Sequence, residues 1–105
     1  MKTYRVLVTA DAKADLKRYK AYLVDEKKNR QAARNVVLDF SQTKDELKKS
    51  AGSLADPESK KLLERGLKRI NFRSHEYFLL YRIEGSRVFV TNMFHDLEDY
   101  ESKLK

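Results

Sequence analysis

Alternating apolar and polar positions divide the chain into strand-like and helix-like regions. Four runs rich in β-branched and aromatic residues predict strands: 4–8, 67–73, 76–84 and 87–94. In the first run, Tyr4, Val6 and Val8 fall on one face. Gly85-Ser86 separates the last two runs and matches a two-residue hairpin loop with glycine at its first position.

Between the first two strands, apolar residues recur at helical spacing and predict two helices. Thr9 stands where an N-cap belongs, Asp11 complements the helix dipole in the first turn, and this helix ends near Lys28. Asn29 can cap the second helix, and Gly52 lies just past its end. Because few residues join the two helices, we expect an antiparallel hairpin. The same spacing places three aromatic residues in the core: Tyr19, Tyr22 and Phe40.

The sequence also predicts two shorter helices, the first with an irregular segment as its alternative. Pro57 suits a first helical position, and a short helix could end at Gly66. Asp96 can cap a last short helix that contains Tyr100. The order predicts an α+β fold over residues 1–105 as a single domain: an N-terminal strand, an antiparallel helical hairpin, a three-stranded antiparallel meander in one sheet, and a short C-terminal helix. The sheet face opposite the helices is expected to be partly open and concave.

Charge and composition restrict the partners. The formal net charge is +7, from 23 basic and 16 acidic residues, which favours nucleic acid or an acidic protein surface. The chain has no cysteine, which excludes disulfides and thiolate metal sites. It also lacks a glycine-rich phosphate loop and metal-ligand spacing, so we expect no cofactor and no metal. Without a signal-peptide h-region or a long apolar run, a soluble cytoplasmic protein is expected, with no membrane contact.

Nearly the whole chain resembles the RelE/ParE superfamily of bacterial type II toxins. The resemblance rests on the following stretches: residues 4–9 leading into Ala12 and Leu16, the basic strand 69–73, the tyrosine-rich hairpin 77–90, and Phe94-His95-Asp96 with Asp99-Tyr100. It implies a small sheet beneath an N-terminal helical hairpin. It further implies either a ribosome-dependent mRNA endonuclease or a DNA gyrase poison, held inactive by a cognate antitoxin.

Cutting RNA without a metal requires a base, cations that stabilise the phosphorane, and an acid for the leaving oxygen. His95 lies where one nuclease branch places a catalytic histidine, and Arg73 and Arg82 are the candidate catalytic cations. The candidate RNA-binding residues are Lys68, Arg69, His75 and Tyr100. Each has a structural alternative: a hydrogen-bonded hinge for the histidine, ion pairs for the arginines, and core packing for the tyrosine.

Two departures from the nuclease pattern bear on this interpretation. Phe78 occupies a position where many nucleases of the family carry arginine. The acidic run 96–99 replaces a basic cluster and would repel phosphate.

Three functions therefore stay open. The sequence favours a metal-independent, ribosome-associated mRNA endoribonuclease that causes growth arrest. The alternatives are a non-enzymatic, ParE-like toxin that poisons DNA gyrase, and a degenerate member that only binds its antitoxin. In each case the expected partner is an antitoxin whose acidic, partly disordered segment folds on binding. We expect that segment to cross a groove lined by Arg69, Arg73 and Arg82.

Overall fold

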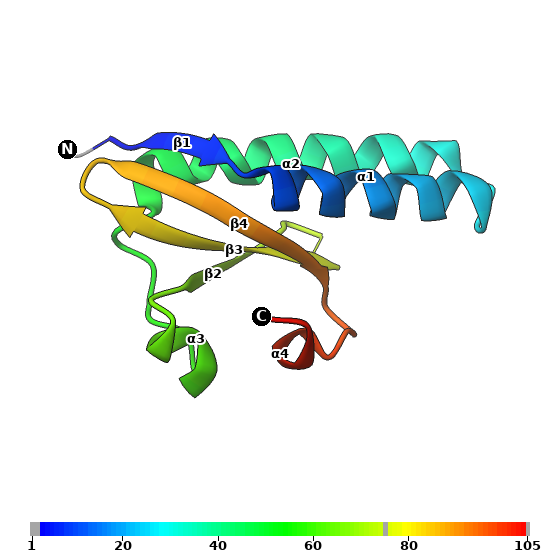
Figure 1. Cartoon of the computed structure of the whole chain (residues 1–105). Coiled ribbons are helices and arrows are strands. Elements are labelled where there is room, and N and C mark those ends of the chain that lie inside the picture. The colour runs from blue at the N-terminus through cyan, green and yellow to red at the C-terminus, as the bar shows by residue number, and fades with distance from the viewer. Residues whose placement is uncertain (1–2, 75, 105) are drawn as a thin grey trace.

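A computed structural model describes residues 3–74 and 76–104. Within these ranges the elements follow one another as β1 (Arg5–Val8), α1 (Ala10–Asp25), α2 (Arg30–Ser50), α3 (Lys60–Glu64), β2 (Lys68–Asn71), β3 (Tyr77–Glu84), β4 (Arg87–His95) and α4 (Tyr100–Lys103). The predicted α+β class is confirmed. The helical hairpin lies along one face of the sheet, and α3 and α4 lie beneath the other (Figure 1).

Both predicted N-caps of the hairpin are confirmed. The Thr9 hydroxyl accepts a hydrogen bond from the Ala12 amide at 3.2 Å, and the Asn29 side chain accepts one from the Ala32 amide at 2.9 Å. The first helix ends at Asp25, before the predicted limit at Lys28. Lys28, in the connection between the two helices, has a φ of 53°. This left-handed conformation turns the backbone so that the second helix runs antiparallel to the first.

Thr9→Ala is expected to lower the free energy of unfolding by about 1 kcal/mol, because an N-cap oxygen satisfies an amide that has no partner in the helix. The same hydroxyl donates to the Thr91 carbonyl oxygen at 3.4 Å, so it also ties the start of α1 to β4. Urea unfolding measures the change. Thr9→Ser keeps the hydroxyl and should stay close to wild type; equal losses in both variants would contradict the capping role.

The four strands form a mixed sheet in the order β1-β4-β3-β2. The last three strands make the predicted antiparallel meander, and β1 pairs in parallel with β4. Gly85, with a φ of 63°, occupies the first position of the two-residue loop between paired Glu84 and Arg87, as expected for a tight hairpin. The N-terminal strand therefore closes one edge of the meander.

A β-bulge in β4 changes which face of the sheet the later side chains of this strand occupy. Leu80 pairs with Asn92 and Tyr81 pairs with Val90, which leaves Thr91 as an extra residue on β4. Before the bulge, Val90 packs in the core beneath the helices. After the bulge, Phe94 packs on the opposite face, because the extra residue reverses the alternation.

The main core lies between the helical hairpin and the sheet. Tyr19 and Phe40 are buried there, as predicted, but Tyr22 is 48% exposed, so its assignment to the core was wrong. Tyr22 follows Tyr19 by three residues, yet its ring lies in the last turn of α1 with the Lys27 ammonium over it at 5.7 Å. Helical spacing alone did not separate the buried tyrosine from the exposed one.

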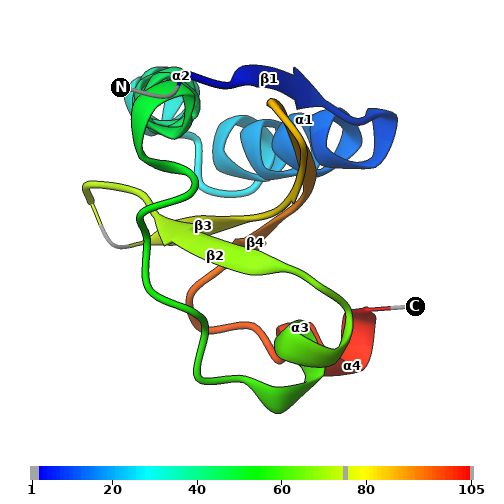
Figure 2. The ribbon, with the colours of Figure 1, turned by 90° about the vertical axis from the view of Figure 1, so that its left-hand side faces the viewer.

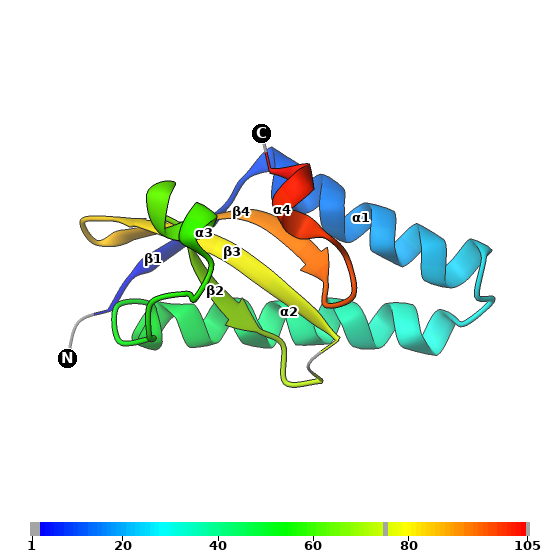
Figure 3. The ribbon, with the colours of Figure 1, turned by 90° about the horizontal axis from the view of Figure 1, so that it is seen from below.

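A second core covers part of the face that we expected to be open. Phe78, Leu80 and Phe94 from the sheet pack against Leu62 of α3 and Leu104 after α4. Figures 2 and 3 show the two short helices side by side on this face. The expected open concave surface is therefore reduced to the part that these helices leave uncovered.

The caps of the short helices differ from the predictions. Ser59, not Pro57, precedes α3, and its hydroxyl accepts from the Leu62 amide at 3.3 Å. Asp99 precedes α4, and Asp96 instead pairs with Arg69 at 2.9 Å. An ion pair to a distant strand thus replaces the local cap that the sequence predicted for Asp96.

Candidate functional site

A pocket lies where α1, β4 and the two short helices meet. It measures about 840 Å³, and Phe94, Leu104 and Leu67 of the second core contribute to its wall. Its apolar lining consists of Ala14, Leu67, Phe94 and Leu104; its polar lining consists of Asp11, Asp15, Arg18, Arg65, Arg82, Thr91, Asn92 and Lys103. Four cations against two carboxylates make it a basic pocket.

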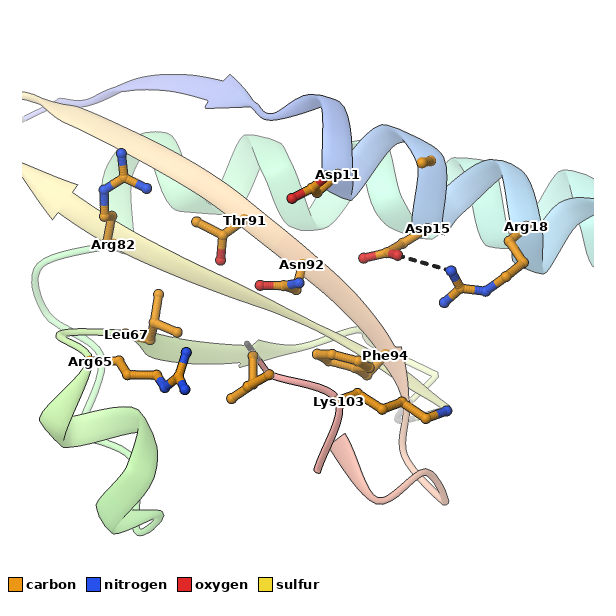
Figure 4. A pocket seen from close by; sticks show the side chains of 12 residues that line it. Asp11, Asp15, Arg18, Arg65, Leu67, Arg82, Thr91, Asn92, Phe94 and Lys103 are labelled. Atoms are coloured by element: carbon orange, nitrogen blue, oxygen red, sulfur yellow. Dashed lines mark hydrogen bonds and ion pairs between the residues drawn. The ribbon is translucent and has the colours of Figure 1, made fainter. Parts of the chain in front are cut away.

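The cations occupy two ends of this pocket. Figure 4 shows Arg65 and Arg82 at one end, Arg18 and Lys103 at the other, and Asn92 between them. Arg18 pairs with Asp15 at 3.2 Å, and Lys103 pairs with Glu98. One end is therefore neutralised by neighbouring carboxylates, whereas the end with Arg65 and Arg82 keeps more positive charge.

Asp15 fixes α1 against β4 at the edge of the pocket. One carboxylate oxygen accepts the Met93 amide at 3.0 Å, just after the bulge, and the other accepts from Arg18. Burial raises the pKa of Asp15, although the hydrogen bonds from Met93 and Arg18 act in the opposite direction. A carboxylate bound in this way has a structural role and is not available as a strong base.

His95 occupies the position of the hydrogen-bonded hinge. Its Nδ1 accepts the Leu97 amide at 3.1 Å, and its ring lies edge-on to Tyr77 with centroids 5.0 Å apart. Its own amide donates to Glu98 Oε1 at 2.9 Å and to the Tyr19 hydroxyl oxygen at 3.1 Å. These contacts hold the end of β4 and the following turn against α1. The predicted hinge was to hold the last helix to the sheet, and these hydrogen bonds instead join the turn before α4 to β4 and α1.

The three candidate catalytic residues are engaged with different neighbours. Arg73 pairs with Glu46 of α2 at 3.2 Å, and Arg82 pairs with Glu84 at 2.6 Å while lying over the Phe89 ring. Within the described residues, no hydrogen bond, ion pair or ring contact joins either arginine to His95. The nuclease roles stay predictions, without a shared site to support them.

The candidate RNA-binding residues are also spread over the structure. Lys68 donates to the Leu54 carbonyl at 2.7 Å, and Arg69 lies 3.7 Å from the Phe78 ring centroid. Tyr100 packs edge-on against the same phenylalanine, with centroids 5.1 Å apart, as its core alternative predicted. His75 lies outside the described residues. The pocket contains Arg82 but neither Arg69 nor Arg73, so the expected three-arginine groove stays a prediction.

Sequence reasoning missed Arg65, Asn92 and Glu98. Arg65 belongs to the basic segment 60–73, but only the fold brings the end of α3 beside β4. Asn92 reaches the pocket because of the bulge, which local alternation did not reveal. Glu98 belongs to the acidic run, yet it accepts hydrogen bonds inside the protein.

Two absences apply to residues 3–74 and 76–104. No group of three or more histidine and carboxylate side chains there could hold a metal ion. No helix in those ranges is long and apolar enough to cross a membrane.

Comparison with known proteins places this arrangement in a family. The family model described as the ParE toxin of the type II toxin–antitoxin system, parDE, matches residues 6–100. The chain belongs to the ParE toxin family. The ParE family is part of the RelE/ParE superfamily that the chain was found to resemble. The family match also supports a cognate antitoxin as the partner.

A solved structure is similar to this ParE toxin over most of both chains. The structure of the chromosomal ParDE toxin–antitoxin system from P. aeruginosa matches with a TM-score of 0.70 and 19% sequence identity. The match covers 89% of this chain and 96% of the other. At this identity the likeness supports the fold. A comparison with curated proteins found no significant match.

Proposed function

We propose that this ParE toxin arrests growth by binding DNA gyrase, without cutting RNA, and that a cognate antitoxin holds it inactive. The family match over residues 6–100 carries the proposal, because the gyrase poisons of the superfamily are its ParE-like members. The mRNA endonuclease favoured by the sequence is the second candidate, and its support is the position of His95 together with the concentrated positive charge.

The side-chain contacts also favour the gyrase proposal. A metal-free nuclease needs its base, acid and cations around one phosphate. Here the His95 Nδ1 lone pair is used by the Leu97 amide, and Arg73 is 71% exposed beside a carboxylate of α2. Phe78, at the position where nucleases carry arginine, is fully buried. Within the described residues, no hydrogen bond or ion pair joins Arg73 to His95, which supports the gyrase proposal over the nuclease.

The test separates the two targets directly. Purified toxin is added to DNA gyrase and relaxed plasmid, and supercoiling is measured on gels; translation is followed by pulse-labelling after induction in cells. We expect supercoiling to fail first. In folded protein, His95→Ala and Arg73→Ala should each change inhibition by no more than about twofold, because the gyrase proposal gives neither side chain a catalytic role.

A nuclease would give the opposite result. Removing its acid or base would lower cleavage by about 10²–10⁴-fold, and labelling would stop before supercoiling changed. Loss of growth arrest in folded His95→Ala, with translation as the first process to fail in wild type, would overturn the gyrase proposal.

A further inference from the structure

The end of the pocket beside Arg65 carries positive charge that the protein itself does not balance. Arg65 is exposed, and within the described residues its side chain forms no hydrogen bond or ion pair. Arg82 pairs with Glu84, but both side chains are about half exposed, at 42% and 53%. An exposed pair contributes at most about 1 kcal/mol, so a better-placed anion can replace the glutamate.

Neutral groups beside these arginines add hydrogen-bonding and apolar surface. Asn92 lines the pocket between the two pairs of cations, and its side-chain amide has no hydrogen-bond partner within the described residues. Leu67, Phe94 and Leu104 form the apolar wall. Cations next to apolar side chains suit an amphipathic segment with acidic residues on one side.

The composition of the pocket favours a peptide over a nucleic acid. Asp11 and Asp15 lie along the same pocket, where they would repel the continuous negative charge of a phosphate backbone. Single-stranded nucleic acids also bind through exposed aromatic rings on which bases stack. The one aromatic residue of the lining, Phe94, is only 4% exposed.

We infer that this pocket binds an acidic, amphipathic segment of the antitoxin, with Arg65 and Arg82 as the anchors for its carboxylates. Apolar side chains of the segment contact Leu67 and Phe94, and the Asn92 amide binds a polar group of its backbone. The inference rests on the proposed function for the existence of the antitoxin. It differs from the expected groove of Arg69, Arg73 and Arg82, because Arg82 is the one arginine of that set that lines this pocket.

The test measures the affinity of the toxin for the antitoxin encoded beside it. Toxin variants are titrated with that antitoxin at low and moderate NaCl concentrations. Arg65→Glu and Arg82→Glu should each raise Kd by about tenfold to a hundredfold, which corresponds to about 1.4–2.8 kcal/mol. Losing a charge-assisted hydrogen bond has effects of this size. Both variants should also show a weaker dependence of Kd on salt.

Lys20→Glu is the matched control. It makes the same change of charge on an exposed position of α1 that does not line the pocket, and it should leave Kd nearly unchanged. Arg82→Lys keeps the charge and should lie between wild type and Arg82→Glu. Circular dichroism and thermal melting verify that each variant is folded; Arg65→Gln serves if a charge reversal disturbs α3.

Two results would overturn the inference. In the first, both folded variants bind the antitoxin as tightly as Lys20→Glu does. In the second, antitoxin binding is unchanged while gyrase inhibition, or binding of a fluorescent single-stranded oligonucleotide, is lost selectively. A wild-type toxin that binds its antitoxin through Arg65 and Arg82 but does not inhibit gyrase would overturn the proposed function and leave this inference standing.

Discussion

Phe78→Ala is expected to lower the free energy of unfolding by about 3–5 kcal/mol, the range for removing a fully buried aromatic side chain. Phe78 has no exposed surface and lies at the centre of the second core. Its ring is in contact with those of Phe94 and Tyr100, at centroid distances of 5.9 and 5.1 Å. The Arg69 guanidinium lies over it at 3.7 Å.

The loss would be large for a domain of this size, because small proteins are stable by only about 5–15 kcal/mol. Since Phe78 supports residues on both sides of α4, the alanine variant should also free the C-terminal segment, with faster amide exchange after residue 96. Guanidinium unfolding and hydrogen exchange measure the two effects. A large loss of stability would also show that position 78 is part of the core, where a buried arginine would be costly.

Phe89→Ala is the control for this prediction. Phe89 lies on the same face of the sheet but is half-buried, with Arg82 over its ring at 4.5 Å. Its loss should cost about 1 kcal/mol, the size of an exposed cation–π contact together with modest burial. If the two variants lost equal stability, the second core would not be a main source of stability.

Glu98→Gln is expected to lower the free energy of unfolding at neutral pH by about 1.5–3 kcal/mol, the range for hydrogen bonds to a charged group. The Glu98 carboxylate accepts hydrogen bonds from the Tyr19 hydroxyl, the His95 amide and Lys103. Burial alone would raise its pKa, but the hydrogen bonds from Lys103, Tyr19 and His95 together lower the pKa to about 2.

The pH dependence follows from the direction of this shift. A carboxylate with a lowered pKa stabilises the folded state above its ordinary pKa of 4.5, and this contribution is lost as the pH falls from about 5 towards 2. The difference in stability between wild type and Glu98→Gln should therefore be largest near neutral pH and shrink through that window. Urea unfolding at several pH values measures it.

Glu26→Gln serves as the control, because Glu26 is exposed and its side chain forms no ion pair within the described residues. Glu26→Gln should have the same free energy of unfolding as wild type at neutral pH, and the difference between the two should not change as the pH falls. A constant difference between wild type and Glu98→Gln from pH 7 to pH 2 would show that the glutamate acts by packing and not by its charge.

Local sequence signals predicted the elements well because their causes are local. The caps at Thr9 and Asn29, the glycine of the hairpin loop and the strand patterns all depend on neighbours within a few residues. The site was harder to predict because its contacts join distant segments. Arg73 contacts a glutamate of α2, and Arg69 contacts Asp96. No periodicity in the sequence indicates such pairs.

Acidic residues near the C-terminus show the same limit. Their run suggested a surface that repels phosphate, which treats each carboxylate as solvated. In the fold, Glu98 is an internal acceptor, Asp96 balances Arg69, and Glu101 accepts from Ser59 before α3. Asp96 and Glu98 of the run each pair with a cation and attach the C-terminal segment to the rest of the protein, so the charge of these two carboxylates is compensated within the molecule.

The extra residue at Thr91 has a consequence for comparing this chain with its relatives. A relative whose last strand lacks the bulge needs a one-residue gap there; without it, every later position is matched to a side chain on the wrong face of the sheet. His95 lies four positions beyond Thr91. A histidine equivalent to it by simple counting could therefore face the opposite core in such a relative, and its chemistry could not be transferred between the two proteins.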